Sequence, residues 1–410
     1  MSKKSPQLRF KGFTDDWEER KLGEVGYFYY GKSAPKWSVT EDAETPCVRY
    51  GELYTKYGAK ISNIYSHTNI NPKNLKFSTG NEVLVPRVGE NPLDFSLCSW
   101  LSIPNVAIGE MISVYNTNEN PLFISYYFRS QMKYEFAKRV EGGNVSNLYY
   151  SYLEDIDLYI PKLEEQIAIS KFFEKLDDTI ALHQRKLDLL KEQKKGYLQK
   201  MFPKNGAKVP ELRFAGFADD WEERKLSDVA NHRGGTAIEK YFDKDGVYKV
   251  ISIGSYGLNS QYVDQNIRAI SNEITDGRVV NSGELTMVLN DKTANGTIIG
   301  RSLLVEQDNE YVINQRTEII SPKETFDSNF AYTILNGSFR EKVKRIVQGG
   351  TQIYVNYSAV SNLSLELPKI EEQQKIGSFF KQLDNTIALH QRKLDLLKEQ
   401  KKGFLQKMFV

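Results

Sequence analysis

The chain contains the same two segments twice, and this duplication limits what it can fold into. Residues 8–22 recur 204 positions later as residues 212–226, with differences only at Lys11/Ala215 and Thr14/Ala218. Residues 179–202 recur as residues 386–409, and these 24 residues differ only at Tyr197/Phe404. An internal repeat of this kind indicates that one structural unit is built twice.

The middles of the two copies diverge. Residues 27–139 and 231–346 share almost no identity, and the copies rejoin at Val140–Gly143 and Val347–Gly350. Near-identical segments suit one kind of partner bound twice, whereas divergent segments suit two different ligands. The alternative is a recent duplication whose loops drifted without purpose. Drift alone should not spare one 24-residue block and alter the roughly 110 residues before it.

A long helix is predicted at the end of each copy, because apolar residues recur there at alternating spacings of three and four. If helical throughout, residues 163–202 would span about 60 Å. Gly196 and Gly403 predict a kink or an early end. The predicted seam residues are Phe173, Leu176, Ile180, Leu187 and Leu190 in the first copy, and Phe380, Leu383, Ile387, Leu394 and Leu397 in the second.

A single apolar seam needs a partner, and the other copy is the nearest one, so we expect an antiparallel coiled coil. Four polar residues interrupt the seam, and they either fix its register or extend their heads into solvent: His183, His390, Lys194 and Lys401. A second, narrower stripe either docks a partner subunit or covers the chain's own module, and it consists of Leu182, Leu189, Leu389 and Leu396.

The expected fold class is α+β or α/β, with two globular mixed modules separated by the long helices. The predicted boundaries are 1–160 for the first module, 161–203 for its helix, 204–367 for the second module and 368–410 for the second helix. Short β-rich runs at 82–85, 111–115 and 311–313 alternate with turns, and helices are expected at 122–138 and 330–346.

Composition is that of a folded protein, with 40% hydrophobic and 26% charged residues among 410. No apolar run approaches the roughly 18 residues of a membrane helix, and we expect no signal peptide. Two cysteines, Cys47 and Cys98, favour the cytoplasm. The net charge is only +2, and because the helical segments 162–204 and 369–410 carry +3 and +4, the remainder carries −5. The net charge of the modules therefore gives no indication of DNA binding.

Two catalytic motifs are matched only superficially. Residues 26–33 fit the phosphate-loop pattern, including Lys32, but bulky aromatic residues fill the part that would wrap a phosphate, and the second copy lacks the lysine. Asn120-Pro121-Leu122-Phe123 resembles the N-P-P-F motif of adenine methyltransferases without its second proline. No metal-ligand spacing or catalytic cluster stands out, and we expect no catalysis, metal or bound cofactor in this chain.

Polar and basic residues sit among Tyr, Gly and Ser in predicted module loops. Arginine and lysine can bind guanine edges, and asparagine and glutamine can bind adenine; the alternative is that these are ordinary solvated loops. The glycine pairs at 142–143 and 349–350 either approach a phosphate or simply turn the chain. The candidate DNA-binding residues are Arg49, Tyr50, Arg87, Asn91, Asn144, Arg233, Lys292, Asn295, Gln315, Arg316 and Gln352.

The arrangement resembles the specificity subunits of Type I restriction–modification systems over essentially the whole chain. The resemblance rests on Trp17–Val25 and, less faithfully, Trp221–Val229, and on the starts of the long helices, Ile160–Gln166 and Leu367–Gln373. One proline of the family pattern is replaced by lysine at the start of each helix. Each motif is moderately specific, and their pairing around a duplicated heptad helix is highly specific.

The resemblance implies a non-catalytic, cytoplasmic subunit whose divergent modules are target-recognition domains for double-stranded DNA. The target would be bipartite and asymmetric, with half-sites about one DNA turn, roughly 34 Å, apart. Two adenine methyltransferase subunits and restriction/translocase subunits would assemble on it, and they would carry S-adenosylmethionine, ATP and magnesium. No membrane is expected. The alternatives are a coiled-coil scaffold with two protein-binding modules and a P-loop ATPase.

Overall fold

The computed structural model describes residues 5–204 and 206–410, and they form two compact units. Unit 1 comprises residues 1–184 and 392–410, and unit 2 comprises residues 185–391. The division falls inside the two long helices and not at the module boundaries predicted above. The reason is that the last part of each helix packs with the unit that does not contain its beginning.

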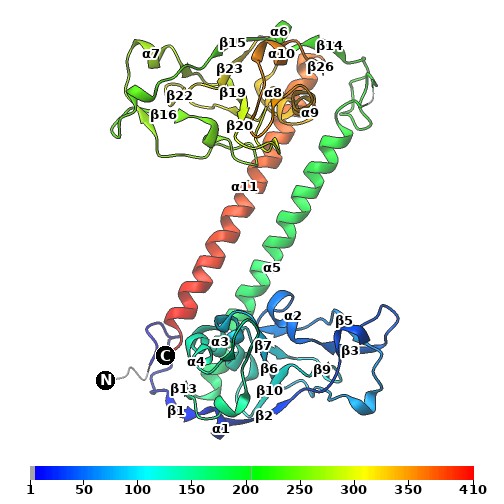
Figure 1. Ribbon diagram of the computed structural model, residues 1–410, viewed down its shortest axis with the longest axis vertical. Coiled ribbons are helices and arrows are strands. Elements are labelled where there is room, and N and C mark those ends of the chain that lie inside the picture. The colour runs from blue at the N-terminus through cyan, green and yellow to red at the C-terminus, as the bar shows by residue number, and fades with distance from the viewer. Residues whose placement is uncertain (1–4, 205) are drawn as a thin grey trace. The chain divides into compact units, whose positions relative to one another are not determined.

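Unit 1 is built on a five-stranded sheet of order β2-β10-β6-β8-β4 (Figure 1). All neighbours are antiparallel except the parallel pair β4/β8. A smaller sheet has the order β5-β3-β9. Strand bounds are β2 (Gly26–Tyr30), β10 (Ile112–Thr117), β6 (Glu82–Pro86), β8 (Ser99–Leu101), β4 (Lys60–Ile61), β5 (Ser66–Thr68), β3 (Thr45–Val48) and β9 (Ala107–Ile108).

Unit 2 repeats this plan with different residues. Its main sheet has the order β15-β23-β19-β21, and its second sheet, also of four strands, has the order β17-β16-β22-β18. In each unit the second sheet contains one parallel pair, β3/β9 or β16/β22. Strand bounds are β15 (Ala230–Gly234), β23 (Thr317–Pro322), β19 (Leu285–Val288), β21 (Ser302–Leu304), β17 (Arg268–Ala269), β16 (Tyr248–Ile251), β22 (Tyr311–Ile313) and β18 (Val279–Val280). The divergent middles therefore share one mixed α/β fold, as the repeat predicts.

Each module has two helices in tandem where one was expected. They are α3 (Pro121–Gln131) with α4 (Lys133–Ala137), and α8 (Ser328–Asn336) with α9 (Ser338–Arg345). The break falls at Met132 in unit 1 and at Gly337 in unit 2, where the backbone leaves helical geometry. The remaining short helices are α1 (Leu22–Val25), α2 (Tyr50–Thr55), α6 (Leu226–Val229), α7 (Glu273–Asp276) and α10 (Tyr357–Ser361).

The repeated segment at 8–22 and 212–226 pairs with the strand that precedes each long helix and forms an ion pair with the first turn of that helix. Strand β1 (Glu18–Lys21) pairs with β13 (Asp157–Ile160), and β14 (Glu222–Lys225) pairs with β26 (Ser364–Leu367). Arg9 donates two hydrogen bonds of 2.7 Å to the buried carboxylate of Glu165, and Arg213 does the same to Glu372. The acids at the start of each helix thus hold the repeated segment as well as complementing the helix dipole.

The long helices α5 (Leu163–Lys200) and α11 (Ile370–Lys407) are continuous. The predicted early end at Gly196 and Gly403 is therefore wrong, because the helices continue to Lys200 and Lys407. The helical penalty of about 1 kcal/mol for one glycine is small beside the packing of the aromatic residues that follow, Tyr197 and Phe404, against their units.

Within each unit the two helices run antiparallel, as expected. In unit 1, Phe172 of α5 contacts Phe404 of α11, with ring centroids 5.1 Å apart, and Asp177 pairs with Lys401. In unit 2, Tyr197 contacts Phe379 at 5.0 Å, and Lys194 pairs with Asp384 at 2.5 Å. Of the predicted seam, Phe173, Leu187, Leu190, Phe380, Leu394 and Leu397 are buried, while Leu176, Ile180, Leu383 and Ile387 are half-buried.

Candidate nucleic-acid interface

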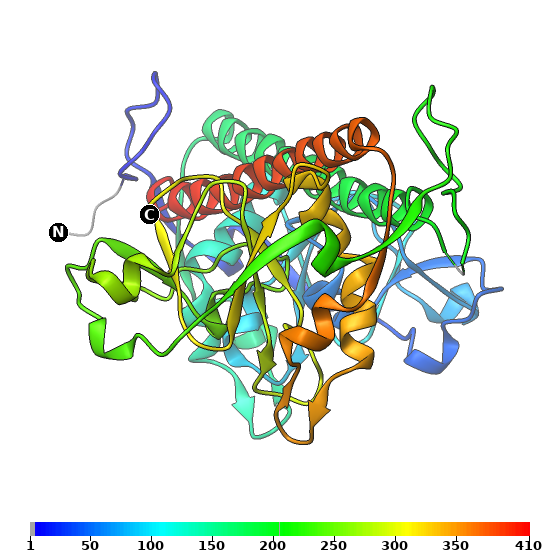
Figure 2. The same ribbon diagram turned by 90° about the horizontal axis from the view of Figure 1, so that it is seen from above.

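Each unit has a small three-stranded sheet outside its main sheets, and its hairpin carries one of the glycine pairs. Unit 1 joins β11 (Glu141–Gly142) and β12 (Ser146–Asn147) to β7 (Val88–Gly89). Unit 2 joins β24 (Gln348–Gly349) and β25 (Ile353–Tyr354) to β20 (Asn290–Asp291). In Figure 2 the β24–β25 hairpin, drawn in orange, projects from unit 2 on the side remote from its helices.

The glycines of these hairpins turn the chain. Gly142 has φ +116° and Gly349 has φ +103°, both in the left-handed region. A Cβ at Gly349 would lie 2.2 Å from the carbonyl oxygen of Gln352. Only glycine fits such a position without strain. The residues between, including Asn144 and Gln352, are exposed at the hairpin tips.

In unit 1, three predicted DNA-binding residues gather at this hairpin. Asn144 lies at its tip, and Arg87 and Asn91 flank β7, the strand that pairs with it. Asn91 is exposed, and its side-chain oxygen accepts a hydrogen bond of 3.2 Å from the amide of Leu93. The topology therefore brings together residues that are more than 50 positions apart in the sequence.

Arg87 is held between two tyrosine rings. Its guanidinium carbon lies 4.7 Å from the ring centroid of Tyr30 and 5.9 Å from that of Tyr149. Its Nε is buried and has no hydrogen-bond partner among the described residues. Stacking on aromatic rings orients the guanidinium. Burial raises the pKa of Tyr30, and the positive charge of Arg87 opposes that shift.

Arg49 and Tyr50 lie at the start of α2, and both are half-buried. The amide of Arg49 donates to the Glu52 carboxylate at 3.0 Å. The same helix reaches β7 through Tyr54, whose hydroxyl donates to the carbonyl oxygen of Val88 at 3.0 Å. These two candidates thus lie on the helix that adjoins the hairpin sheet.

In unit 2, three predicted residues line one groove of about 230 Å³: Lys292, Gln315 and Arg316. Lys292 follows β20, and the other two form the turn between β22 and β23. Arg316 has φ +65°, an uncommon backbone conformation for arginine. Such geometry is often found where function requires it, and here it accompanies an exposed side chain.

Glu239 supplies the negative charge of this groove. Its carboxylate accepts hydrogen bonds from the side chains of Asn314 at 3.0 Å and Gln315 at 2.8 Å. Its own backbone amide and these two side-chain amides lower the pKa of Glu239. The groove therefore contains a carboxylate that accepts hydrogen bonds beside two basic side chains, Lys292 and Arg316, that donate them. Base edges present both donors and acceptors, so a surface that recognises them needs both kinds of group.

The remaining predicted DNA-binding residues of unit 2, Asn295, Gln352 and Arg233, do not line this groove. Asn295 is exposed in the loop after β20, and Gln352 is at the tip of the adjoining hairpin. Arg233 lies on β15 and is engaged by the Glu284 carboxylate at 2.8 Å and by the carbonyl oxygen of Val279 at 3.3 Å. The structure thus places Arg233 in a partly exposed ion pair with Glu284 of the same module.

The two motif matches are accounted for by local structure. Residues 26–30 of the phosphate-loop pattern form strand β2, paired with β10 along its length, so they cannot wrap a phosphate. Asn120 is the N-cap of α3, accepting from the Phe123 amide at 2.8 Å. Among the described residues, no group of His, Cys, Asp and Glu could hold a metal ion. None of the helices in the described ranges is sufficiently long and apolar to span a membrane.

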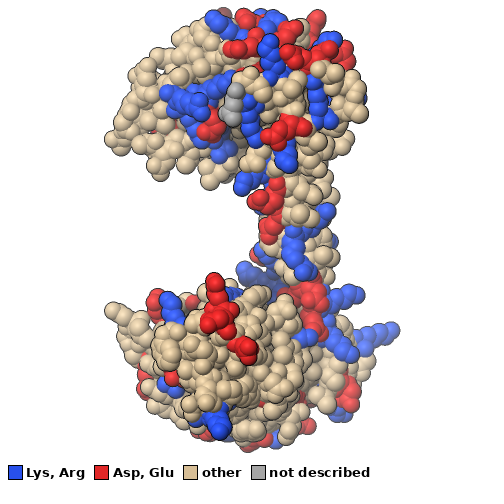
Figure 3. All heavy atoms as spheres, turned by 90° about the vertical axis from the view of Figure 1, so that its right-hand side faces the viewer, with Lys and Arg blue, Asp and Glu red and all other residues tan. Residues whose placement is uncertain are grey.

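Sequence reasoning missed the aromatic partners of Arg87 and the acid Glu239. In the sequence, Tyr30 stands out only as part of the phosphate-loop match. Tyr149 lies in a run of tyrosines at 149, 150 and 152 beside the glycine pair, and that run was the available signal. Figure 3 shows basic and acidic side chains interspersed on the visible face of each unit, in keeping with the near-zero net charge.

The predicted docking leucines are exposed. In unit 1, Leu182 is 60% and Leu396 is 52% exposed; in unit 2, Leu189 is 51% and Leu389 is 61% exposed. The alternative that they cover the chain's own modules is therefore wrong.

Comparisons with known proteins agree with this architecture. The family model described as Type I restriction modification DNA specificity domain matches residues 14–192 and again 218–399. The Type I restriction enzyme MjaVIII specificity subunit of Methanocaldococcus jannaschii is 23% identical over 409 residues, covering 95% of this chain and 91% of that protein. The Type I restriction enzyme HindI specificity subunit of Haemophilus influenzae is 25% identical over 197 residues, 47% of this chain and 41% of that protein.

A solved structure shares the fold. The crystal structure of a Type I restriction–modification system S subunit from M. genitalium has a TM-score of 0.66 at 13% identity, covering 99% of each chain. Because the family model matches both halves of the chain, one after the other, the protein belongs to the family of Type I restriction–modification DNA specificity subunits.

Proposed function

We propose that this chain reads a bipartite, asymmetric DNA target, with one half-site for each module, and directs partner subunits to it. One observation carries the proposal: a single fold occurs twice in the chain, with a near-identical helical repeat at 179–202 and 386–409 but divergent module residues at 27–139 and 231–346. A protein that recognises two different half-sites needs the same framework at each site but different residues that contact the bases.

Unit 1 would present Arg87, Asn91 and Asn144, with Arg49 and Tyr50 beside them. Unit 2 would present Lys292, Asn295, Gln315, Arg316 and Gln352. Arginine and lysine favour guanine, and asparagine and glutamine favour adenine. Arg233 would contribute indirectly, by pairing with Glu284, the residue that precedes strand β19.

The partners would be two methyltransferase subunits and restriction/translocase subunits. The exposed leucines Leu182, Leu189, Leu389 and Leu396 would contact the methyltransferase subunits, because each unit offers one leucine from each helix. The partners would bring S-adenosylmethionine, ATP and magnesium, and adenine would be the methylated base. This chain would act in the cytoplasm without catalysing a reaction itself.

The test is to co-express the chain with its methyltransferase subunit in a host without other methyltransferases and map methylated adenines across the genome. One split motif with two different halves is expected. If no motif depends on this chain, while its modules capture a protein, the scaffold alternative would replace the proposal. Variants of Arg316 and Arg87 to alanine should relax recognition in one half each, by about 1–3 kcal/mol at the contacted base pair.

The helices would set the gap between the half-sites. Lengthening both helices by one turn should shift the gap in the methylated motif, because a helix turn adds about 5.4 Å against about 3.4 Å per base pair. An unchanged gap would show that another part of the complex sets it.

A further inference from the structure

A groove of about 600 Å³ in unit 1 lies outside the hairpin surface. It is bounded by the junction of α3 and α4, by the first half of α5 and by the end of α11. Its charged lining consists of Arg129, Lys133, Asp177, Lys398, Lys401 and Lys402. Five cations and one carboxylate give this concave surface a formal charge of +4.

The single carboxylate is already engaged by the protein. Asp177 pairs with Lys401 and accepts a hydrogen bond of 2.8 Å from the hydroxyl of Tyr126. Arg129 is also hydrogen-bonded to the protein, because its guanidinium donates to the carbonyl oxygens of Cys98 at 2.5 Å and Gly58 at 2.8 Å. These contacts build the wall of the groove and leave the guanidinium charge of Arg129 without a carboxylate partner among the described residues.

Three lysines remain for a ligand. Lys133, Lys398 and Lys402 are exposed, and none of them makes an ion pair or a side-chain hydrogen bond within the described ranges. Three flexible ammonium groups around one groove suit phosphate oxygens, which lysine binds as a point charge. The apolar lining is limited to the half-buried Ile180 and Leu405, whereas a protein partner would be expected to anchor an aromatic or aliphatic side chain in a pocket.

The charge distribution favours nucleic acid as the source of the phosphates. The modules are net acidic, and the helical segments carry the positive charge of the chain. Phosphate contacts supply nearly all of the non-specific affinity of a DNA-binding protein and a large share of its specific affinity. Those contacts do not depend on sequence, so they can be made by a segment that is the same in both copies.

We infer that this groove binds backbone phosphates of the DNA duplex. The inference rests on the proposed function and assigns the phosphate contact to Lys133, Lys398 and Lys402. It also predicts that the two units differ in the number of phosphate contacts they make. The lysines of the helix occur in both copies, whereas the module residues that line the groove do not.

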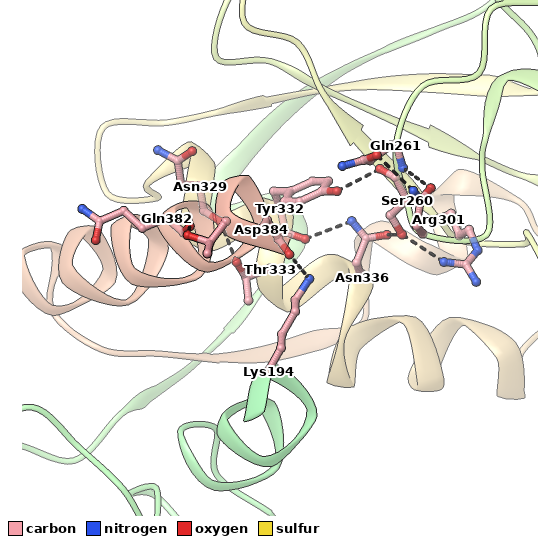
Figure 4. A network of polar contacts seen from close by, with 12 residues as sticks. Lys194, Ser260, Gln261, Arg301, Asn329, Tyr332, Thr333, Asn336, Gln382 and Asp384 are labelled. Atoms are coloured by element: carbon pink, nitrogen blue, oxygen red, sulfur yellow. Dashed lines mark hydrogen bonds and ion pairs between the residues drawn. The ribbon is translucent and has the colours of Figure 1, made fainter. Parts of the chain in front are cut away.

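In unit 2 the helix supplies Lys191 and Lys195 at the positions of Lys398 and Lys402. The position of Arg129 is occupied by Asn336, which is held by Ser260 and Tyr332 as Figure 4 shows. The position of Lys133 is occupied by Arg340, which is buried and donates to the carbonyl oxygens of Ile299 and Gly296 at 2.9 Å. The module of unit 2 therefore adds no exposed cation at these two positions.

The test uses two triple variants of the full chain, assembled with its methyltransferase subunit on duplex DNA. The groove variant is K133Q/K398Q/K402Q. The control is K171Q/K175Q/K393Q, which removes the same charge from exposed lysines of the same unit that do not line the groove. DNA affinity is measured over a fourfold range of salt concentration, on a target duplex and on a non-target duplex.

The groove variant should reduce the slope of log affinity against log salt by about two to three on both duplexes, since each lost phosphate contact removes about 0.9. Over the fourfold salt range, wild-type affinity should therefore fall about 40-fold more than that of the groove variant. The control should change the slope by less than about one.

Three results would overturn the inference. Equal slopes for the two triple variants would show that only net charge matters. Loss of assembly with the methyltransferase subunit at an unchanged DNA slope would assign the groove to a protein partner. Thermal stabilisation of the isolated chain by inorganic pyrophosphate, abolished in the groove variant while the DNA slope is unchanged, would assign it to a small phosphate compound. If the wild-type complex itself fails to bind DNA, the proposed function fails and not the groove alone.

Discussion

Lys194 of α5 pairs with Asp384 of α11 at 2.5 Å, and the repeat places the same pair, Lys401 with Asp177, in unit 1. Both pairs are half-buried, with side chains 25–32% exposed. These lysines interrupt the apolar seam, and the expectation that their heads extend into solvent is wrong. The ion pairs favour one axial register of the two antiparallel helices in each unit, because a shift by one turn would separate the charges.

The Asp177–Lys401 pair is expected to contribute more to the free energy of unfolding than the Asp384–Lys194 pair. Asp177 also accepts the hydroxyl of Tyr126, whereas the nearby Tyr332 of unit 2 donates to the carbonyl oxygen of Ser260. Asp177→Ala should therefore lower the free energy of unfolding by about 2 kcal/mol, and Asp384→Ala by about 1 kcal/mol. Urea unfolding measures both, with the exposed neighbour Asp178→Ala as control. Equal losses for Asp177→Ala and Asp178→Ala would show that the contacts of Asp177 with Lys401 and Tyr126 do not stabilise the fold.

Glycine substitutions in the long helices should separate local from tertiary effects. A Cβ at Gly196 or Gly403 would meet no other atom within 4 Å, so each change to alanine should raise the free energy of unfolding by up to about 1 kcal/mol. Gly377→Ala is the matched control, because its Cβ would lie 2.6 Å from the backbone nitrogen of Phe330. Thermal unfolding should show a higher Tm for the first two variants and a lower one for the control. A lower Tm for Gly196→Ala would indicate that the glycine is needed for a bend.

Glu318 should make the stability of unit 2 depend on pH. It lies on β23 and contacts Nδ1 of His232 at 2.6 Å, and the ring of Tyr357 lies against His232 at 4.5 Å. Burial raises the pKa of Glu318 above its usual value of 4.5, although His232 and Arg278 partly oppose the shift. The folded protein therefore binds this proton more tightly than the unfolded chain, and the stability contribution of Glu318 falls as pH rises above 4.5.

Glu318→Gln removes this titration. The free energy of unfolding of the variant minus that of the wild type should therefore increase between about pH 4 and pH 7. Urea unfolding at a series of pH values measures the difference. A difference that stays constant or shrinks with pH would show that Glu318 is not destabilised by its burial.

The sequence predicts the architecture well because periodicity is a local property. The heptad spacing places Phe173 and Phe380 in the seam, and both are buried. The turns at Gly142 and Gly349 follow from residue type in the same way. Local rules fail where tertiary packing outweighs them, as at Gly196, or where a helix breaks without a proline, as at Met132.

The candidate interface is less predictable because its partners are distant in the sequence. Nothing near Arg233 indicates that Glu284, 51 positions away, will engage it. The tyrosines beside Arg87, Tyr30 and Tyr149, lie 57 positions before it and 62 positions after it in the sequence. Nothing in the sequence indicates the lysine groove either, because Lys133 and Lys398 are brought together by the fold alone.

The independence of the two modules is tested most directly by exchanging residues 27–139 for the corresponding segment of another specificity subunit and mapping genomic methylation with the same methyltransferase. We predict that one half of the methylated motif changes while the other half and the gap remain. A motif that changes in both halves would contradict the claim that each module reads its own half-site.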